Sequence, residues 1–159
     1  MKAPQFELPA VDGKRYSPIT ARGDKGLLVM FICNHCPYVK RAIDRIVREC
    51  KELAPLGIGS IAVMSNDPAD YPEDSFDNMK RVAREKGFPF PYVIDQSQDV
   101  ARAYGAVCTP EFFGFDAGLD LQYHGRVDEM FDAMRQIADT GKGPAKQIAS
   151  VGCSIKWRK

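Results

Sequence analysis

The sequence predicts an α/β fold in which helices flank a mixed central β-sheet. Segments 26–32 (GLLVMFI) and 58–65 (IGSIAVMS) are apolar at nearly every position, which is typical of strands buried on both faces. An amphipathic helical pattern separates them, and such a strand–helix–strand unit favours parallel pairing. Two more strand-like segments, 111–115 and 119–123, are separated by a glycine-containing turn and predict an added antiparallel hairpin.

The N-terminal residues predict a short β-hairpin. Segments 6–8 and 15–17 flank Asp12 and Gly13, a pair that favours a tight turn because glycine accepts positive φ. After the first buried strand, apolar residues recur from Val39 at spacings of three and four, which predicts an amphipathic helix. A proline and a glycine just before the second buried strand end this helix.

The middle of the chain predicts an inserted βα unit. A loop rich in Asn, Asp and Pro is followed by a helical pattern that ends at a glycine, then by a short strand and by a short helix that ends at another glycine. These four elements cover, in order, residues 66–72, 73–86, 92–94 and 99–104. The last predicted helix covers 128–140, and the tail 141–159 has no clear period.

Length and composition indicate one globular domain. A chain of 159 residues is long enough to bury a core, so we expect a single domain over 1–159 with the tail 141–159 packed back on it. The 22 basic and 21 acidic residues nearly balance, which argues against a nucleic-acid partner. No apolar run is long enough to span a bilayer, and residues 1–25 lack the apolar stretch of a secretory signal, so we expect no membrane partner and a cytoplasmic location.

Cys33 and Cys36 are predicted to be the chemical centre. Cysteines at positions i and i+3, where a strand meets a helix, have Cα atoms about 5–6 Å apart, a separation that a disulfide accepts. We expect Cys33 at the helix N-terminus, where free N–H groups and the helix dipole stabilise a thiolate, and Cys36 one turn further in. Cys33 is therefore the predicted nucleophile and Cys36 the resolving thiol.

Neighbouring residues are expected to support this pair. Asn34 and His35 complete the motif, and His35 places a polarisable or positive group beside the nucleophile, which favours the thiolate. Pro37 suits the first helical turn, where its missing N–H costs little. Thr109 and Pro110 stand at the start of a strand, where an X-Pro bond is a candidate cis peptide. Such a bond would lay an open strand edge against the disulfide and offer a substrate chain main-chain hydrogen bonds.

The strand–CxxC–helix start, the inserted βα unit and the Thr-Pro before a hairpin resemble the thioredoxin superfamily, nearest its thiol-disulfide isomerase-like and peroxiredoxin-like (AhpC/TSA-like) branches. The likeness covers nearly the whole chain and is to a bacterial group with a CNHCP motif. It rests on four strings, FICNHCPYVK at 31–40, SND at 65–67, TPEFF at 109–113 and GCSIKW at 152–157. The resemblance implies a thioredoxin-like fold and thiol-disulfide exchange without a cofactor or metal. The implied partners are protein or small-molecule disulfides or thiols and an external reductant.

The sequence departs from thioredoxin beside the cysteine pair. Ile32 stands where thioredoxin has Trp, and the apolar strand 27–32 lacks thioredoxin's buried Asp, which is its proton-transfer partner. Glu111, just past Pro110, is a candidate replacement, although a side chain at this strand position can equally face solvent. The resemblance therefore leaves the proton-transfer group of this chain open.

Two other functions stay open at this point. A peroxiredoxin-like thiol peroxidase carries Thr or Ser three residues before its peroxidatic cysteine, whereas here Met30 precedes Cys33, and Cys33 precedes Cys36, at that spacing. A non-enzymatic thioredoxin-like module would bind a metal or a protein. A tetrahedral zinc site, however, needs two ligands more than one CxxC motif provides.

Three further cysteines have alternative interpretations. Cys50 lies on the apolar helical face and is expected in the core. Cys108 either packs beside the sheet or approaches the redox pair. Cys153 is either a third redox thiol on a tail that folds back or a lone surface thiol. Because five is an odd number, at least one thiol lacks an intrachain partner.

Overall fold

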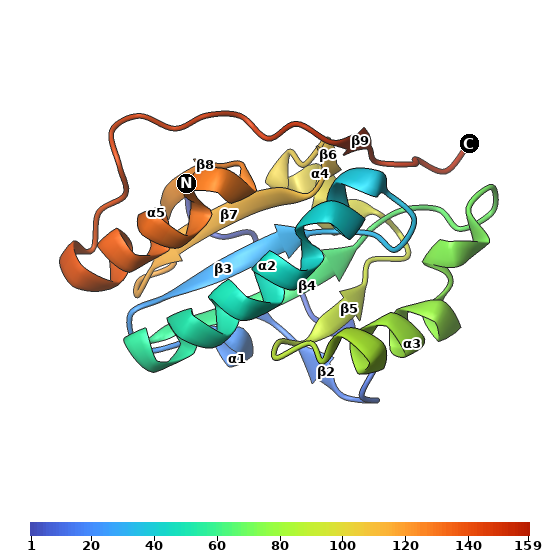
Figure 1. Cartoon of the computed structure of the whole chain (residues 1–159), viewed down its shortest axis with the longest axis horizontal. Coiled ribbons are helices and arrows are strands. Elements are labelled where there is room, and N and C mark those ends of the chain that lie inside the picture. The colour runs from blue at the N-terminus through green and yellow to red at the C-terminus, as the bar shows by residue number, and fades with distance from the viewer.

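The computed structural model describes all 159 residues and has a central five-stranded sheet of order β5-β4-β3-β7-β8 (Figure 1). β3, β4 and β5 are parallel, whereas β7 runs antiparallel to β3, and β8 antiparallel to β7. The strands cover Gly26–Phe31 (β3), Ile58–Met64 (β4), Tyr92–Ile94 (β5), Glu111–Asp116 (β7) and Leu121–Gly125 (β8). The mixed sheet that the sequence predicts is therefore confirmed.

Helices cover both faces of this sheet, as predicted. The helices are Pro18–Ala21 (α1), Pro37–Leu53 (α2), Phe76–Lys86 (α3), Asp99–Tyr104 (α4) and Val127–Thr140 (α5), with 3-10 turns at Ala54–Leu56 (η1) and Pro72–Asp74 (η2). Side chains of α2, α3 and α5 form one core cluster with Leu28 and Met30 of β3. Side chains of α4 form a second cluster with Leu27 and Val29, which point to the opposite face because side chains alternate along a strand.

Short elements lie outside the central sheet. The predicted N-terminal hairpin forms between Leu8–Pro9 (β1) and Arg15–Tyr16 (β2). α1, which begins with a capping box between Ser17 and Thr20, was not predicted. The pairing of Cys108–Thr109 (β6) with Cys153–Ser154 (β9), which joins the tail to the middle of the chain, was not predicted either.

The hairpin between β7 and β8 differs from the prediction. β8 begins at Leu121, two residues later than expected, because the turn is longer than Asp116-Ala117-Gly118. Leu119 has a φ of 64° and is buried, so it belongs to the turn and not to an extended strand. The Asp116 side chain accepts hydrogen bonds from the N–H groups of Gly118 and Asp120, which closes this turn.

The C-terminal tail returns from the end of α5 along the edge of the molecule to β6, so that β9 lies beside the loop before β7 (Figure 1). The tail therefore brings residues from the end of the chain to the carboxyl end of the central strand β3.

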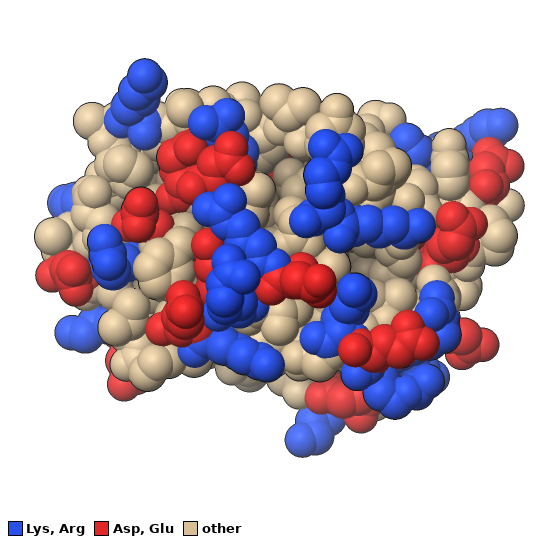
Figure 2. Space-filling model, viewed as in Figure 1, with Lys and Arg blue, Asp and Glu red and all other residues tan.

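Basic and acidic side chains intermingle on the face of the molecule shown in Figure 2. None of the helices combines the length and the apolar composition that crossing a bilayer requires.

Candidate active site

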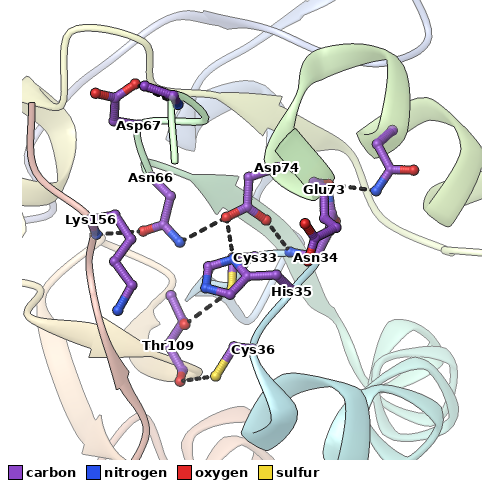
Figure 3. A network of polar contacts seen from close by, with 12 residues as sticks. Cys33, Asn34, His35, Cys36, Asn66, Asp67, Glu73, Asp74, Thr109 and Lys156 are labelled. Carbon is purple, nitrogen blue, oxygen red and sulfur yellow. Dashed lines mark hydrogen bonds and ion pairs between the residues drawn. The ribbon is translucent and has the colours of Figure 1, made fainter. Parts of the chain in front are cut away.

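The cysteine motif lies at the carboxyl end of β3. β4 runs parallel to β3 and pairs Val63 with Phe31, so the loop after β4 reaches the same edge of the sheet as the motif (Figure 3). Both cysteines are nearly inaccessible, with Cys33 2% and Cys36 0% exposed. All five thiols of the chain are free. The site is therefore a buried dithiol covered by the loop after β4 and by the loop before β7.

The helix after the motif begins later than the sequence predicts. Pro37 occupies its first turn, as expected, but Cys36 is the N-cap residue and Cys33 lies outside the helix. The prediction that Cys33 sits at the helix N-terminus with Cys36 one turn further in is therefore wrong. Pro37 explains the difference, because it disfavours helical backbone at the residue before it.

The pKa values of the two thiols move in opposite directions. The pKa of Cys36 is lowered, first because the Cys33 thiol donates a hydrogen bond to its sulfur; burial opposes this effect, and the Cys153 thiol and the Val39 amide add to it. The pKa of Cys33 is raised by the same hydrogen bond, by burial and by the negative charge of Asp74. When the reduced pair loses one proton, the negative charge thus belongs to Cys36, at the positive end of α2.

Asp74 of η2 is the central acceptor of the site, and it was not among the predicted site residues. Its carboxylate is fully buried and accepts hydrogen bonds from the Asn34 N–H (2.7 Å) and the Asn66 amide (3.1 Å). Asn34 binds Oδ1, whereas Oδ2 accepts from Asn66 and also lies 2.5 Å from His35 Nδ1 (Figure 3). The His35 ring is held further by stacking on Tyr71, with centroids 4.2 Å apart. His35 is therefore positioned by a carboxylate and an aromatic ring.

Asn34 fastens the cysteine loop to the rest of the fold. Its side-chain amide donates to the Glu73 carbonyl (2.9 Å), and its Oδ1 accepts from the hydroxyl of Tyr92 (2.8 Å). Tyr92 is fully buried on β5. The Asn34 side chain thus links the residues between the two cysteines to η2 and to an edge strand of the sheet.

Tyr92→Phe should lower the free energy of unfolding by about 1 kcal/mol, because Asn34 Oδ1 loses its donor inside the protein. Urea unfolding followed by circular dichroism measures this difference. Tyr38→Phe is the matched control, since Tyr38 is 41% exposed. Equal stability of the Tyr92 variant and the parent would contradict the proposed role of this hydrogen bond.

The Thr109–Pro110 peptide bond is cis, and Thr109 contacts both cysteines. Its hydroxyl lies 3.4 Å from Cys33 Sγ, and its carbonyl oxygen lies 3.5 Å from Cys36 Sγ (Figure 3). The strand edge here is not open, which corrects the prediction. β9 pairs with β6 in antiparallel register, with Thr109 opposite Cys153. The chain's own tail thus occupies the main-chain edge that was expected to receive a substrate chain.

Glu111 does not contact the cysteine pair, so the structure does not support its suggested proton-transfer role. One carboxylate oxygen accepts hydrogen bonds from the N–H groups of Val107 and Cys108, and the other contacts His124. Burial by itself raises the pKa of Glu111, but these hydrogen bonds outweigh burial and hold the pKa below its usual value. Glu111 fixes the turn that precedes Thr109 and Pro110.

The two other buried cysteines have contacts away from the redox pair. Cys50 lies in the core, as predicted, 3.9 Å from Met30 Sδ, and burial raises its pKa to about 12. Cys108 is buried beside Glu111 Oε1, at 3.7 Å, and burial together with that carboxylate raises its pKa to about 12. Neither thiol is activated for attack, since the thiolate is the nucleophile.

A cleft between α2 and α3 leads to Cys33. It has a volume of about 330 Å³, and its walls combine apolar side chains with charged ones of both signs. Cys33 and Asn34 lie at one end, Lys40 comes from α2, and Arg81 comes from α3. Cys36 does not line this cleft. Of the two cysteines of the motif, Cys33 is therefore the one that borders the cleft.

Three side chains of the site have the chemistry of metal ligands. Donor atoms of Cys33, His35 and Asp74 all lie within 4.8 Å of one another. A thiolate, an imidazole and a carboxylate suit zinc, but a structural zinc site takes four ligands, and the Asp74 oxygens already accept hydrogen bonds. The cluster therefore suits hydrogen bonding better than metal binding.

A buried dithiol at the end of the central strand, next to a cis-proline loop and under a flanking helix, defines a thioredoxin-like redox protein. The sequence matches the AhpC/TSA family over residues 1–124, and the chain belongs to that family. α5 and the tail with Cys153 lie beyond the matched residues. The resemblance to the thioredoxin superfamily and the predicted fold class are both confirmed.

Solved structures show the same fold. An uncharacterized conserved protein from Geobacillus kaustophilus is 40% identical, with a TM-score of 0.95 over 99% of this chain and 91% of that chain. A hypothetical protein from Sinorhizobium meliloti 1021 is 31% identical, with a TM-score of 0.95 over 99% and 93%. A thioredoxin-family thiol:disulfide interchange protein from Chlorobium tepidum is 23% identical, with a TM-score of 0.71 over 87% and 95%. No curated protein matched the sequence.

Proposed function

We propose that the protein is a thiol-disulfide oxidoreductase in which Cys33 attacks a substrate disulfide and Cys36 resolves the mixed disulfide. The observation that carries the proposal is the shared contact of both sulfurs with Thr109, together with the opening of the cleft at Cys33 alone. Substrates are small-molecule or protein disulfides or thiols, and an external reductant completes the cycle. No cofactor takes part.

Protons and electrons balance in the proposed exchange between the cysteine pair and the substrate disulfide. Because the Cys33 thiol donates a hydrogen bond to the Cys36 thiolate, its proton passes to Cys36 as Cys33 attacks. A bond forms between Cys33 and one substrate sulfur, and the other substrate sulfur leaves as a thiolate. That thiolate takes the proton from Cys36, and Cys36 then attacks Cys33. The Cys33–Cys36 disulfide forms, and the reduced substrate is released.

A titration in glutathione buffers, with mass spectrometry of the alkylated peptides, tests the proposal. The expected result is a disulfide between Cys33 and Cys36. Cys36→Ser should retain a stable mixed disulfide on Cys33, because its resolving thiol is missing. Cys50→Ala is the control, since Cys50 lies away from the site and should not change the titration. Absence of the disulfide across the glutathione range, or trapping only by Cys33→Ser, would contradict the proposed roles.

A thiol peroxidase is the second candidate, and the position of Cys36 favours it. Cys36 caps α2 and has a lowered pKa, which suits attack on a peroxide. Cys36 would then be oxidised to a sulfenic acid with release of water, and Cys33 would condense with it to a disulfide. Catalytic peroxide consumption by the parent would favour this function over the first, provided that Cys33→Ser still reacts once with peroxide and Cys36→Ser does not react.

A cytoplasmic location is proposed on the same chemistry. The five cysteines are an odd number and do not form the pattern of a secreted disulfide framework, and thiols stay reduced in compartments that hold glutathione or thioredoxin. Fractionation of cells with an antibody to the protein tests this location. Recovery from a membrane or an extracellular fraction would contradict it.

A further inference from the structure

The tail holds Cys153 in a fixed place beside the redox pair. Before Cys153, the Ile148 carbonyl accepts from the Arg126 N–H (3.1 Å), and the Ser150 hydroxyl donates to the Gly125 carbonyl (2.6 Å). These contacts attach the tail to the end of β8. The approach of the tail to the site is therefore part of the folded structure.

The residues after Cys153 are attached more firmly. Ile155 is 3% exposed in the second core cluster, and its N–H donates to the Val107 carbonyl (3.0 Å). The Lys156 N–H donates to Asn66 Oδ1 (2.9 Å), and the Lys156 carbonyl accepts from the N–H of Asp67 (2.8 Å) and from Gln98 (2.9 Å). Asn66 also donates to Asp74, so the tail and the active-site network share a residue (Figure 3).

Gly152 allows the tail to come this close. A Cβ atom at this position would lie 2.0 Å from the Thr109 carbonyl oxygen and 3.3 Å from Pro110 N. Only glycine therefore fits where the tail crosses the cis peptide bond. The next residue, Cys153, stands opposite Thr109, whose carbonyl oxygen lies 3.5 Å from Cys36 Sγ.

The Cys153 side chain lies beside the redox pair. It is half-buried and packs against the core cluster that contains Cys33 and Cys36. Burial and the neighbouring Cys36 sulfur raise the pKa of Cys153, and Cys153 does not line the cleft at Cys33. Cys36 thus has Cys33 as one neighbouring thiol and Cys153 as another, and Cys153 is the least buried of the three.

We propose that Cys153 is a second resolving thiol, which exchanges with Cys36 in the Cys33–Cys36 disulfide. The tail holds it at the strand edge beside Thr109, where a substrate chain was expected to pair. The inference rests on the proposed function, which supplies the Cys33–Cys36 disulfide. The Cys153 thiolate attacks Cys36 Sγ, so that the 36–153 bond forms as the 33–36 bond breaks. Cys33 leaves as a thiolate and takes up the proton that Cys153 released. Oxidation state is conserved, and Cys33 is again free to meet a substrate in the cleft.

The full-length Cys33→Ser variant tests this inference, because it removes the competing partner of Cys36. Oxidation with a small excess of oxidised glutathione should give an intramolecular disulfide between Cys36 and Cys153, identified by peptide mapping under non-reducing conditions. Recovery of Cys36 as its glutathione mixed disulfide, with Cys153 still a free thiol, would overturn the inference. Intermolecular dimers linked through Cys153 would overturn it as well.

A second variant tests whether formation of the 36–153 disulfide depends on the position of the tail, and not only on the presence of the Cys153 thiol. Gly152→Val in the Cys33→Ser background should slow formation of the 36–153 disulfide about tenfold or more, because the added side chain pushes the tail away from Thr109. Gly118→Ala is the matched control, since a Cβ there meets only ordinary contacts at 3.5 Å or more. An unchanged rate in the Gly152 variant would contradict the role of the tail.

Failure of the inference and failure of the proposed function give different results. If the otherwise unaltered protein forms the 33–36 disulfide but Cys33→Ser forms no 36–153 disulfide, only the role of Cys153 is wrong. If the unaltered protein forms no 33–36 disulfide, the proposed function is wrong, and the inference falls with it.

Discussion

Replacement of Asp74 by alanine should lower the free energy of unfolding by about 3 kcal/mol or more, because a fully buried acceptor of several hydrogen bonds is lost. The Asn34 N–H and the Asn66 amide would stay buried without a partner, and His35 would lose the carboxylate that orients it. Urea unfolding measures the difference. A change within about 0.5 kcal/mol, the range of ordinary surface substitutions, would contradict this role of Asp74.

Asp74→Asn isolates the effect of charge on the thiols. The negative charge of Asp74 helps to raise the pKa of Cys33, behind the hydrogen bond to Cys36 and burial, so its removal should lower that pKa. The pH dependence of Cys33 alkylation, followed by mass spectrometry, reports the shift. Asp70→Asn is the control, because Asp70 lies exposed in the same loop. A merely structural role for Asp74 would leave the alkylation profile in place after correction for unfolding.

Asp74 also shows which part of the site the cysteine motif alone does not predict. The cysteine motif is visible as a string, whereas Asp74 is 38 residues further along, at the start of the segment 73–86 that the sequence predicts to be helical. The signal was available in the topology, because loops that follow adjacent parallel strands meet at one sheet edge. In the sequence, β3 has no carboxylate, and the predicted strand 111–115 after Pro110 offers only Glu111. In this chain a carboxylate comes instead from the loop after β4.

Periodic segments were predictable, and short or irregular ones were not. β5 and α4 have the predicted bounds because apolar runs and glycine stops mark them in the sequence. β9 spans two residues, too few for any period, and it depends on a close crossing at Gly152 that only the folded chain reveals. The start of α2 was misplaced because Pro37, and not Cys33, sets the first turn.

Glu111→Ala should lower the free energy of unfolding by about 2–3 kcal/mol at neutral pH, because the N–H groups of Val107 and Cys108 lose their shared acceptor. Urea unfolding measures this loss, and Glu7→Gln is the control, since Glu7 is an exposed carboxylate paired with Arg15 on the surface. A loss no larger than that of the control would contradict the role of Glu111 in fixing the turn before Pro110.

Glu111→Gln tests the charge of this carboxylate through pH. The pKa of Glu111 is held below its usual value of 4.5, so its charge stabilises the folded state fully above that pH, and this stabilisation is lost as pH falls through the lowered pKa. The parent should therefore lose more stability than Glu111→Gln on acidification. Glu111 holds the Val107 N–H, and the Val107 carbonyl accepts a hydrogen bond from the Ile155 N–H of the tail. The same acidification should therefore loosen the β6–β9 pairing. Parallel acid-unfolding curves of the two proteins would contradict this coupling of Glu111 to the site.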